Sequence, residues 1–142
     1  MLTRKIINLL NLKMGLQMKK IIFITLIFFT INGLAVNWKK VAENETGNYY
    51  VDFDSIKKHE GLTYYSDLVD FIEPYDGNFS AVSKYKVDCK KENQTWLNFA
   101  TYSQPMGKGD VIKESTPNEV IYPQNNTIYF FLIKNICNFR KR

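Results

Sequence analysis

The clearest pattern in the chain is a strict alternation of residue types after residue 81. Residues suited to a protein interior occupy every second position, namely Ser83, Tyr85, Val87 and Cys89. Charged residues occupy the positions between and after them, namely Lys84, Lys86, Asp88 and Lys90. Because successive side chains of a strand point to opposite faces of a sheet, this pattern predicts a strand with one buried and one solvated face. Cys89 is therefore expected to point inward.

Four further segments have the aromatic and β-branched content of strands, and they are residues 36–42, 48–53, 62–72 and 95–102. Pro74 and the turn at 76–78 are expected to end the third of them. In the fourth, Leu97 and Phe99 should lie on one face and Trp96, Ala100 and Tyr102 on the other. A strand with apolar residues on both faces is expected near the centre of the sheet.

The remaining segments are predicted to be turns or helix. Asp54 and Ser55 are expected to cap a brief helical turn over 56–58, and Gly61 to end it. The loop around Pro105 and residues 115–125 are expected to be irregular.

The last element, residues 127–137, is compatible with either a strand or a helix. We favour a helix with Asn126 as its cap. Its apolar residues would then share one stripe, formed by Tyr129, Phe130, Ile133, Ile136 and Cys137.

An apolar run near the N-terminus, from Ile21 to Ala35, directly follows two lysines. Positive charge, a short apolar segment and small residues at Gly33 and Ala35 are the three parts of a secretory signal. We expect cleavage after Ala35, with an uncleaved anchor or a buried helix as less favoured alternatives, and Met18 as an alternative start. The mature domain would be residues 36–142. Since no cysteine is available there for lipidation, we expect a periplasmic or secreted product.

The formal net charge of +5 belongs to this leader. The leader contains five of the 19 basic residues and none of the 14 acidic ones, so the mature domain is formally neutral. The basic surface that a nucleic-acid-binding protein needs is therefore not expected.

The only two cysteines, Cys89 and Cys137, both lie in the mature domain. An even number of cysteines in an exported domain favours a disulfide. Free thiols or a metal pair are the alternatives, but a single histidine and the absence of a CxxC motif give a metal few ligands.

The sequence predicts no catalytic, cofactor-binding or metal-binding site. Asp52, Asp54, His59 and Glu60 lie close together in sequence, but a capped and solvated turn explains them better than an acid–base cluster. Ser103 lacks the GxSxG context of a nucleophile elbow.

A basic stripe with aromatic neighbours is the one candidate ligand-binding surface, and it comprises Lys84, Lys86, Lys90, Lys91, Trp96 and Tyr102. An ordinary solvated sheet face is the alternative interpretation. As a docking surface it would suit an acidic protein, a polysaccharide or another envelope component.

Several motifs in order carry a resemblance to a known family, and they are Trp38, YYVDFDSIKK at 49–58, VDCK at 87–90, YSQPMGKGDV at 102–111 and IC at 136–137. Together they resemble the bacterial surface-adhesin protein E family over nearly the whole mature chain. The resemblance implies an α+β fold, with one antiparallel sheet of about six strands and a C-terminal helix fastened to one face by the disulfide.

The resemblance also implies a function. The adhesin that gives the family its name is an outer-membrane lipoprotein that binds host extracellular-matrix proteins. We therefore expect an exported, non-enzymatic, adhesin-like binding module of the bacterial cell envelope, without a cofactor. A small periplasmic enzyme and an accessory subunit of an envelope assembly are the alternatives.

Overall fold

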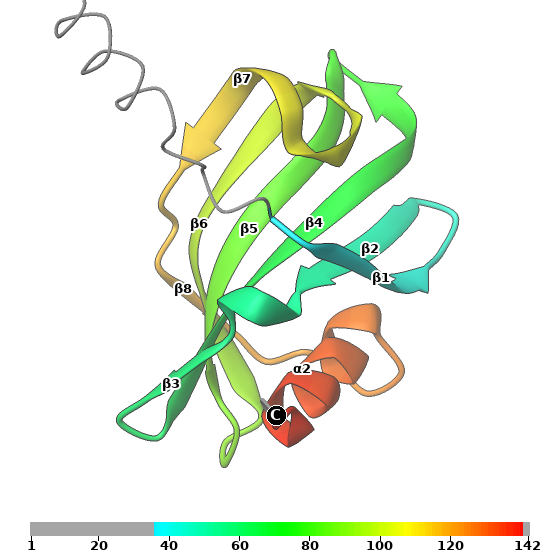
Figure 1. The fold of residues 1–142 in the computed structure, drawn as a ribbon. Coiled ribbons are helices and arrows are strands. Elements are labelled where there is room, and N and C mark those ends of the chain that lie inside the picture. Colours follow the sequence, from blue (N-terminus) through cyan, green and yellow to red (C-terminus); the bar gives the residue numbers. More distant parts are fainter. Residues whose placement is uncertain (1–35, 141–142) are drawn as a thin grey trace, which may run out of the picture. The chain divides into compact units, whose positions relative to one another are not determined.

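Eight antiparallel strands and one helix make up the fold, as seen in a computed structural model that describes residues 36–140 (Figure 1). The predicted signal segment and its alternative start at Met18 lie outside the described residues. The strands are β1 (Trp38–Glu43), β2 (Gly47–Asp52), β3 (Lys57–His59), β4 (Leu62–Tyr75), β5 (Asn78–Asp88), β6 (Asn93–Gln104), β7 (Lys108–Ser115) and β8 (Glu119–Ile121). The helical segments are η1 (Phe53–Ser55), η2 (Pro105–Gly107) and α2 (Ile128–Asn138).

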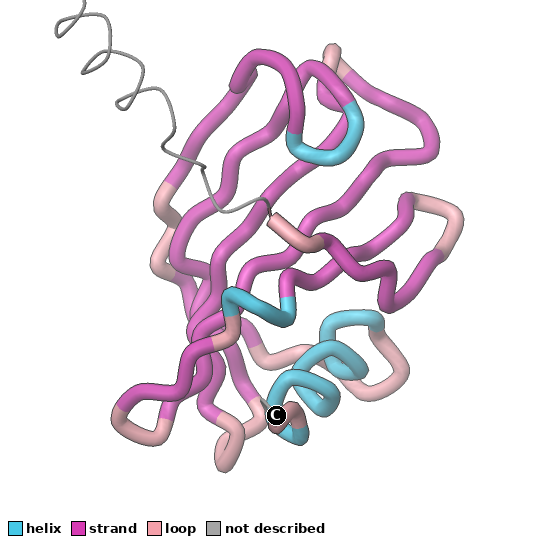
Figure 2. The backbone as a smooth tube through the Cα atoms, in the orientation of Figure 1, coloured by secondary structure: helices cyan, strands magenta, loops and turns pink. Residues whose placement is uncertain are grey.

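The sheet is six strands wide, in the order β1-β2-β4-β5-β6-β7. The two additional strands pair with the ends of the long central strands: β3 with β4, and β8 with β6. Helix α2 lies on one side of this strand layer (Figure 2). We call that side the helix face and the opposite side the outer face. The predicted α+β architecture is confirmed.

The segment after β2 differs from the prediction. The short helical turn is η1, one turn earlier than expected, and its N-cap is Asp52, whose carboxylate accepts a hydrogen bond from the Asp54 amide at 3.1 Å. Residues 57–59 form β3 instead of a helical turn. They can pair with β4 because Glu60 and Gly61 both have positive φ, 51° and 78°, and close a tight turn.

Two other predicted boundaries were wrong. Strand β4 continues through Pro74, which lies where the register with β5 shifts between Asp70 and Tyr75. A proline is tolerated at such an irregularity because no regular ladder hydrogen bond is required from it. The segment 115–125 is not wholly irregular either, since β8 pairs with β6 there.

The C-terminal element is a helix, as predicted, but its details differ. Its N-cap is Thr127, whose hydroxyl accepts a hydrogen bond from the Phe130 amide at 3.2 Å. Leu132, and not Phe130, completes the buried stripe with Ile133 and Ile136. These three side chains pack into a core formed with the sheet residues Val51, Ile56, Tyr65, Tyr85 and Val87.

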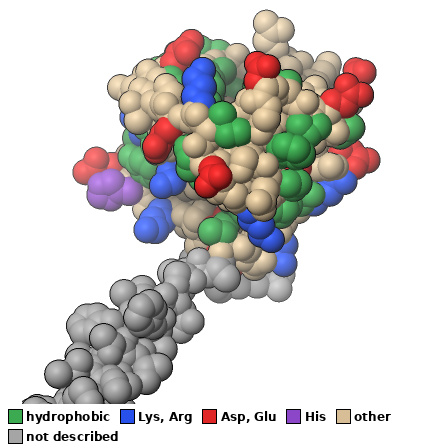
Figure 3. Space-filling model, turned by 90° about the horizontal axis from the view of Figure 1, so that it is seen from above, with side chains coloured by type: hydrophobic (Ala, Val, Ile, Leu, Met, Phe, Trp, Pro, Cys, Tyr) green, Lys and Arg blue, Asp and Glu red, His purple; other side chains and the backbone are tan. Residues whose placement is uncertain are grey.

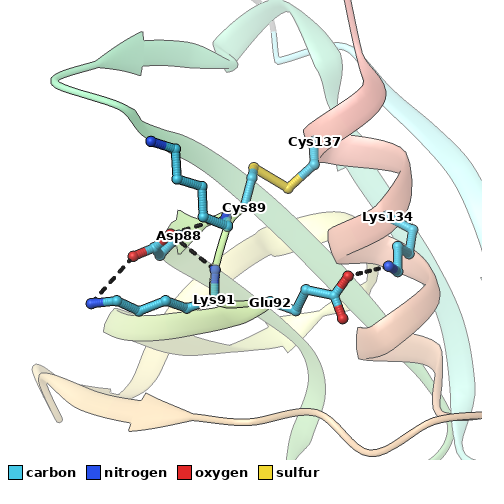
Figure 4. A network of polar contacts seen from close by, with 7 residues as sticks. Asp88, Cys89, Lys91, Glu92, Lys134 and Cys137 are labelled. Atoms are coloured by element: carbon cyan, nitrogen blue, oxygen red, sulfur yellow. Dashed lines mark hydrogen bonds and ion pairs between the residues drawn. A yellow bond between two sulfur atoms is a disulfide. The ribbon is translucent and has the colours of Figure 1, made fainter.

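A disulfide joins Cys89, just after β5, to Cys137 in the last turn of α2 (Figure 4). The two Cα atoms are 5.7 Å apart. An ion pair between Lys134 and Glu92 connects the helix to the same turn. The inward direction of Cys89 and the disulfide are both confirmed, so α2 is fixed to the end of the sheet where the β5–β6 turn lies.

Asp67 is the unusual member of the interior. It lies on the helix face of β4, opposite Val51 of β2 and Ser83 of β5, and its exposed fraction is 0%. Neither carboxyl oxygen has a hydrogen-bond partner of regular geometry, although the Ser83 backbone amide lies close by. Burial raises the pKa of this carboxyl from 3.8 to about 8, and the nearby Ser83 backbone amide opposes the rise only in part. Asp67 is therefore a neutral acid at pH 7.

Removing the disulfide tests its contribution to stability. The double variant Cys89→Ala/Cys137→Ala should lose about 4 kcal/mol of unfolding free energy, because the bridge restrains a loop of 48 residues in the unfolded chain. Urea unfolding followed by circular dichroism measures the loss. A reductant should destabilise the wild type and leave the variant unchanged. A loss below about 1 kcal/mol would contradict this role.

The buried carboxyl predicts how stability depends on pH. Because the folded-state pKa of Asp67 lies above its usual value of 3.8, the folded state holds this proton more tightly than the unfolded chain. Its stabilising contribution is complete below pH 4 and is lost as pH rises towards about 8. Urea unfolding should show a decline of up to about 1.4 kcal/mol per pH unit. Asp67→Asn should abolish that slope, and an unchanged slope would refute the assignment.

Candidate functional site

The basic stripe predicted from the sequence begins on β5. Lys84 is exposed and Lys86 half-buried, and both lie on the outer face, as expected. Directly opposite residues of neighbouring strands point to the same face. Lys84 lies between Ser66 and Asn98, and Lys86 between Tyr64 and Thr95. No carboxylate is therefore directly across a strand from either lysine.

Strand β3 adds a third lysine that the sequence analysis did not place. Lys57 lies directly opposite Tyr64, on the other side from Lys86. Two lysines thus flank one tyrosine in a single row across three strands. We call Lys57, Tyr64, Lys84 and Lys86 the lysine face. Lys57 was missed because residues 56–58 were expected to be helical and not paired with β4.

Lys90 and Lys91 belong to the turn after β5 and not to this face. Their backbone amides donate hydrogen bonds to the Asp88 carboxylate at 3.0 and 3.2 Å, and the Lys91 ammonium lies 3.6 Å from it (Figure 4). The backbone amides of Lys91 and Lys90, together with the Lys91 charge, hold the pKa of Asp88 below its usual value. These contacts give the two residues a role in shaping the turn.

Trp96 and Tyr102 were expected on one exposed face with the lysines, and Trp96 is not there. A β-bulge at Leu97 lets Tyr85 pair with Trp96 while Lys84 pairs with Asn98. The additional residue turns Trp96 to the helix face. Phe99 lies on that face too, with ring centroids 4.7 Å from Trp96. The predicted separation of these two rings was wrong because period-two counting fails across a bulge.

Tyr102 remains on the outer face but far along the strand from Lys86. It lies opposite Ser80 and lines a separate hollow together with Trp38, Val82 and Met106. The six candidate residues therefore separate into an outer-face pair of lysines, a turn, a helix-face tryptophan and a remote tyrosine.

An aromatic hollow of about 410 Å³ on the helix face is a feature that the sequence analysis missed. Its lining residues come from β2, β4, β5, β6, β8 and α2, and they are Tyr49, Val69, Phe71, Tyr75, Ala81, Ser83, Tyr85, Gln94, Trp96, Phe99, Thr101, Ile121 and Tyr129. Tyr75 is 57% exposed, so the hollow opens to solvent beside it.

Stacked rings continue from the core into this hollow. Tyr65 stacks on Tyr85 with centroids 5.3 Å apart, and Tyr85 stacks on Trp96 at 6.4 Å. Tyr129 of α2 contacts both Tyr49 and Tyr85, at 6.3 and 6.0 Å. Burial raises the pKa of Tyr85 and of Tyr129, so both remain neutral phenols at neutral pH.

A few polar groups interrupt the apolar lining. The Tyr65 hydroxyl donates a hydrogen bond to the Gln94 amide oxygen at 2.9 Å. The Thr101 hydroxyl and the Trp96 indole nitrogen are buried without a hydrogen-bond partner. Thr101 as a whole is only 5% exposed. Unpaired buried polar groups are rare in folded proteins and call for an explanation.

The residues considered for catalysis have structural or solvent-exposed positions. His59, the only histidine of the sequence, has a side chain 71% exposed and lies 3.6 Å from the Glu60 carboxylate (Figure 3). The Ser103 hydroxyl accepts a hydrogen bond from the Asp110 amide at 2.8 Å. Within residues 36–140, no three His, Cys, Asp or Glu side chains gather as a metal site would require. No helix among these residues is long and apolar enough to cross a membrane.

Solved structures with the same fold include three of protein E from Haemophilus influenzae. Crystal form II aligns with a TM-score of 0.53 and 17% identity, covering 70% of this chain and 86% of that chain. A second structure gives a TM-score of 0.52 and 16% identity, covering 70% and 83%. The selenomethionine form gives 0.52 and 17%, covering 70% and 84%. At these identities the likeness establishes the fold alone.

Sequence comparison provides the family. No curated protein matches the chain. Residues 38–138, from the start of β1 to the end of α2, match the sequence profile of the family described as surface-adhesin protein E. This match covers the whole sheet, the helix and both cysteines. The chain therefore belongs to the surface-adhesin protein E family.

Proposed function

We propose that this protein is an exported, non-enzymatic binding module of the bacterial cell envelope that docks a polyanionic partner on its lysine face. Membership of an adhesin family supports the binding role. The observation that carries the docking surface is the cross-strand pairing of Lys57, Tyr64 and Lys86, with Lys84 in the adjacent row. Carboxylates are missing from the positions directly across the strands from these lysines.

The spacing of the lysine face suits an extended acidic ligand. Lys84 and Lys86 are two residues apart on one strand, which separates their Cα atoms by about 7 Å. Lys57 and Lys86 lie two strands apart, or about 10 Å. Such an array can contact successive negative charges of an acidic polysaccharide or an acidic protein segment, and Tyr64 offers an apolar surface between them. The binding is expected to weaken as salt screens the charges.

One observation favours an accessory subunit of an envelope assembly as a second candidate. Strand β7 lies at one edge of the sheet, and all its residues except Ser115 are exposed. An edge strand can accept a further strand from a partner. For the enzymatic alternative, by contrast, the aromatic hollow supplies no Asp, Glu, His or Lys among its lining residues in the described part of the chain.

Charge removal tests the lysine face. The double variant Lys84→Ser/Lys86→Ser should bind heparin, used as a sulfated polysaccharide probe, about tenfold more weakly at low salt, because two contacts to the polyanion are lost. Adding Lys57→Ser should weaken binding further. Surface plasmon resonance measures the affinities, and thermal melting should show little change in stability.

A matched control removes two charges from the helix-face side. Lys39 and Lys113 lie opposite Val51 and Thr101, so Lys39→Ser/Lys113→Ser changes the net charge equally without touching the lysine face. Heparin affinity should fall by less than about twofold in this control. Equal losses in the two double variants would show non-specific attraction and reject the docking surface.

The proposed export makes a direct prediction about the mature chain. Expressed in full in a Gram-negative host, the protein should be recovered from the periplasm or the medium with Val36 as its first residue. Intact-mass measurement after alkylation without reductant should show no modified cysteine, because Cys89 and Cys137 are bridged. A cytosolic product that begins at Met1 or Met18 and carries two alkylated thiols would contradict export.

A further inference from the structure

Seven aromatic residues gather around the hollow on the helix face, and they are Tyr49, Phe71, Tyr75, Tyr85, Trp96, Phe99 and Tyr129. They come from four strands and the helix, so the fold and not local sequence brings them together. Within residues 36–140, none of the side chains that line the hollow carries a formal charge. The face of an aromatic ring is the negative part of its quadrupole and attracts cations.

Asp67 is buried next to this hollow but does not line it. Its direct neighbour across β5, Ser83, lines the hollow, as does Val69 two residues further along the same face of β4. In its ionised form Asp67 raises the pKa of Tyr85 and of Tyr129, two of the lining tyrosines, so its carboxyl lies near both rings. The carboxyl is wholly buried, and the Ser83 backbone amide near it forms no hydrogen bond of regular geometry with it.

Among residues 36–140, no cation lies directly across the sheet from Asp67. The packed elements present Val51 from β2, Tyr65 from β4, Ser83 and Tyr85 from β5, and Tyr129 from α2. The titratable groups among these are phenols that stay protonated. A buried carboxyl usually has a charged or strongly hydrogen-bonded partner, so a cation bound in the adjacent hollow would be attracted to this one.

We propose that the aromatic hollow binds a small organic cation with an alkylammonium head group, which the aromatic faces contact and which the adjacent buried carboxyl of Asp67 attracts from behind the lining residues. A methylated ammonium needs no hydrogen-bond acceptor, which suits a site of ring faces. The volume of about 410 Å³ lies in the range of small-ligand sites. This site is on the opposite side of the sheet from the lysine face and does not depend on the proposed docking function.

One ammonium group of the protein already occupies an aromatic face at the rim. The Lys113 nitrogen lies 5.9 Å from the centroid of the Phe99 ring. This contact shows that the rim accommodates a cation over a ring. It also places a like charge beside the proposed ligand, so Lys113 should oppose cation binding.

Choline and its uncharged isostere 3,3-dimethylbutan-1-ol give a direct test, since the two differ in charge but hardly in shape. Isothermal titration calorimetry on the mature, oxidised protein should show saturable choline binding, with the isostere at least about tenfold weaker. Choline affinity should rise with pH up to about 8, because the bound cation favours ionised Asp67 and binding at lower pH must release its proton.

Variants separate the parts of the site. Asp67→Asn should remove the pH dependence of choline affinity. Lys113→Met should tighten choline binding by about two- to threefold by removing the like charge. Lys39→Met is the matched control, because Lys39 also lies on the helix-face side, opposite Val51, but does not line the hollow. The choline affinity of this control variant should equal that of the wild type.

Three results would overturn the proposal. Choline and the isostere could bind equally, which would identify an apolar site. Choline could fail to bind saturably while the protein is folded and oxidised. Choline affinity of Lys113→Met could equal or fall below that of the wild type, which would place the cation away from this hollow. Loss of heparin binding in the lysine-face variant has no bearing on any of these measurements.

Discussion

The attachment of α2 to one end of the sheet is the constraint on which the rest of the structure depends. The disulfide and the Lys134–Glu92 ion pair hold the helix near the β5–β6 turn, and Leu132, Ile133 and Ile136 cover the core there. A helix of 11 residues spans only about 16 Å, whereas β4 with 14 residues extends over more than 40 Å. The helix therefore covers only part of the helix face of the sheet. The aromatic hollow lies where the covered part of that face ends.

The sequence predicted this arrangement where local rules were sufficient. The period-two pattern of β5 placed Cys89 inward and Lys84 and Lys86 outward, because nothing interrupts that strand. It failed for β6, where the additional residue at Leu97 moves Trp96 to the other face. A bulge depends on the register with a neighbouring strand, which the residues of β6 alone do not specify. For the same reason β3 was missed, since its three residues are a strand only because β4 pairs with them.

The hollow and Asp67 could not be predicted for a different reason. Asp67 follows Ser66 in a strand that also contains Asp70, and nothing in sequence distinguishes a buried carboxyl from one that meets a polar partner. Asp70 is in fact satisfied, since its carboxylate accepts a hydrogen bond from the Met106 amide at 2.6 Å. That partner lies 36 positions away in sequence and reaches β4 only because η2 folds over the outer face. Tertiary contacts thus decide that Asp70 has a hydrogen-bond partner of regular geometry and that Asp67 does not.

The two faces of the sheet differ in chemistry although residues 36–142 are formally neutral. The outer face carries lysines whose cross-strand neighbours are uncharged, while the helix face carries aromatic rings and a neutral acid. The net charge sums over both faces, so a value of zero reveals neither the lysines of one face nor the aromatic rings of the other. A ligand that approaches one face is separated from the other by the full backbone layer, so affinities on the two faces can change independently. A domain of this size can therefore combine a salt-sensitive macromolecular contact with a small-ligand site, provided the helix stays fastened at one end.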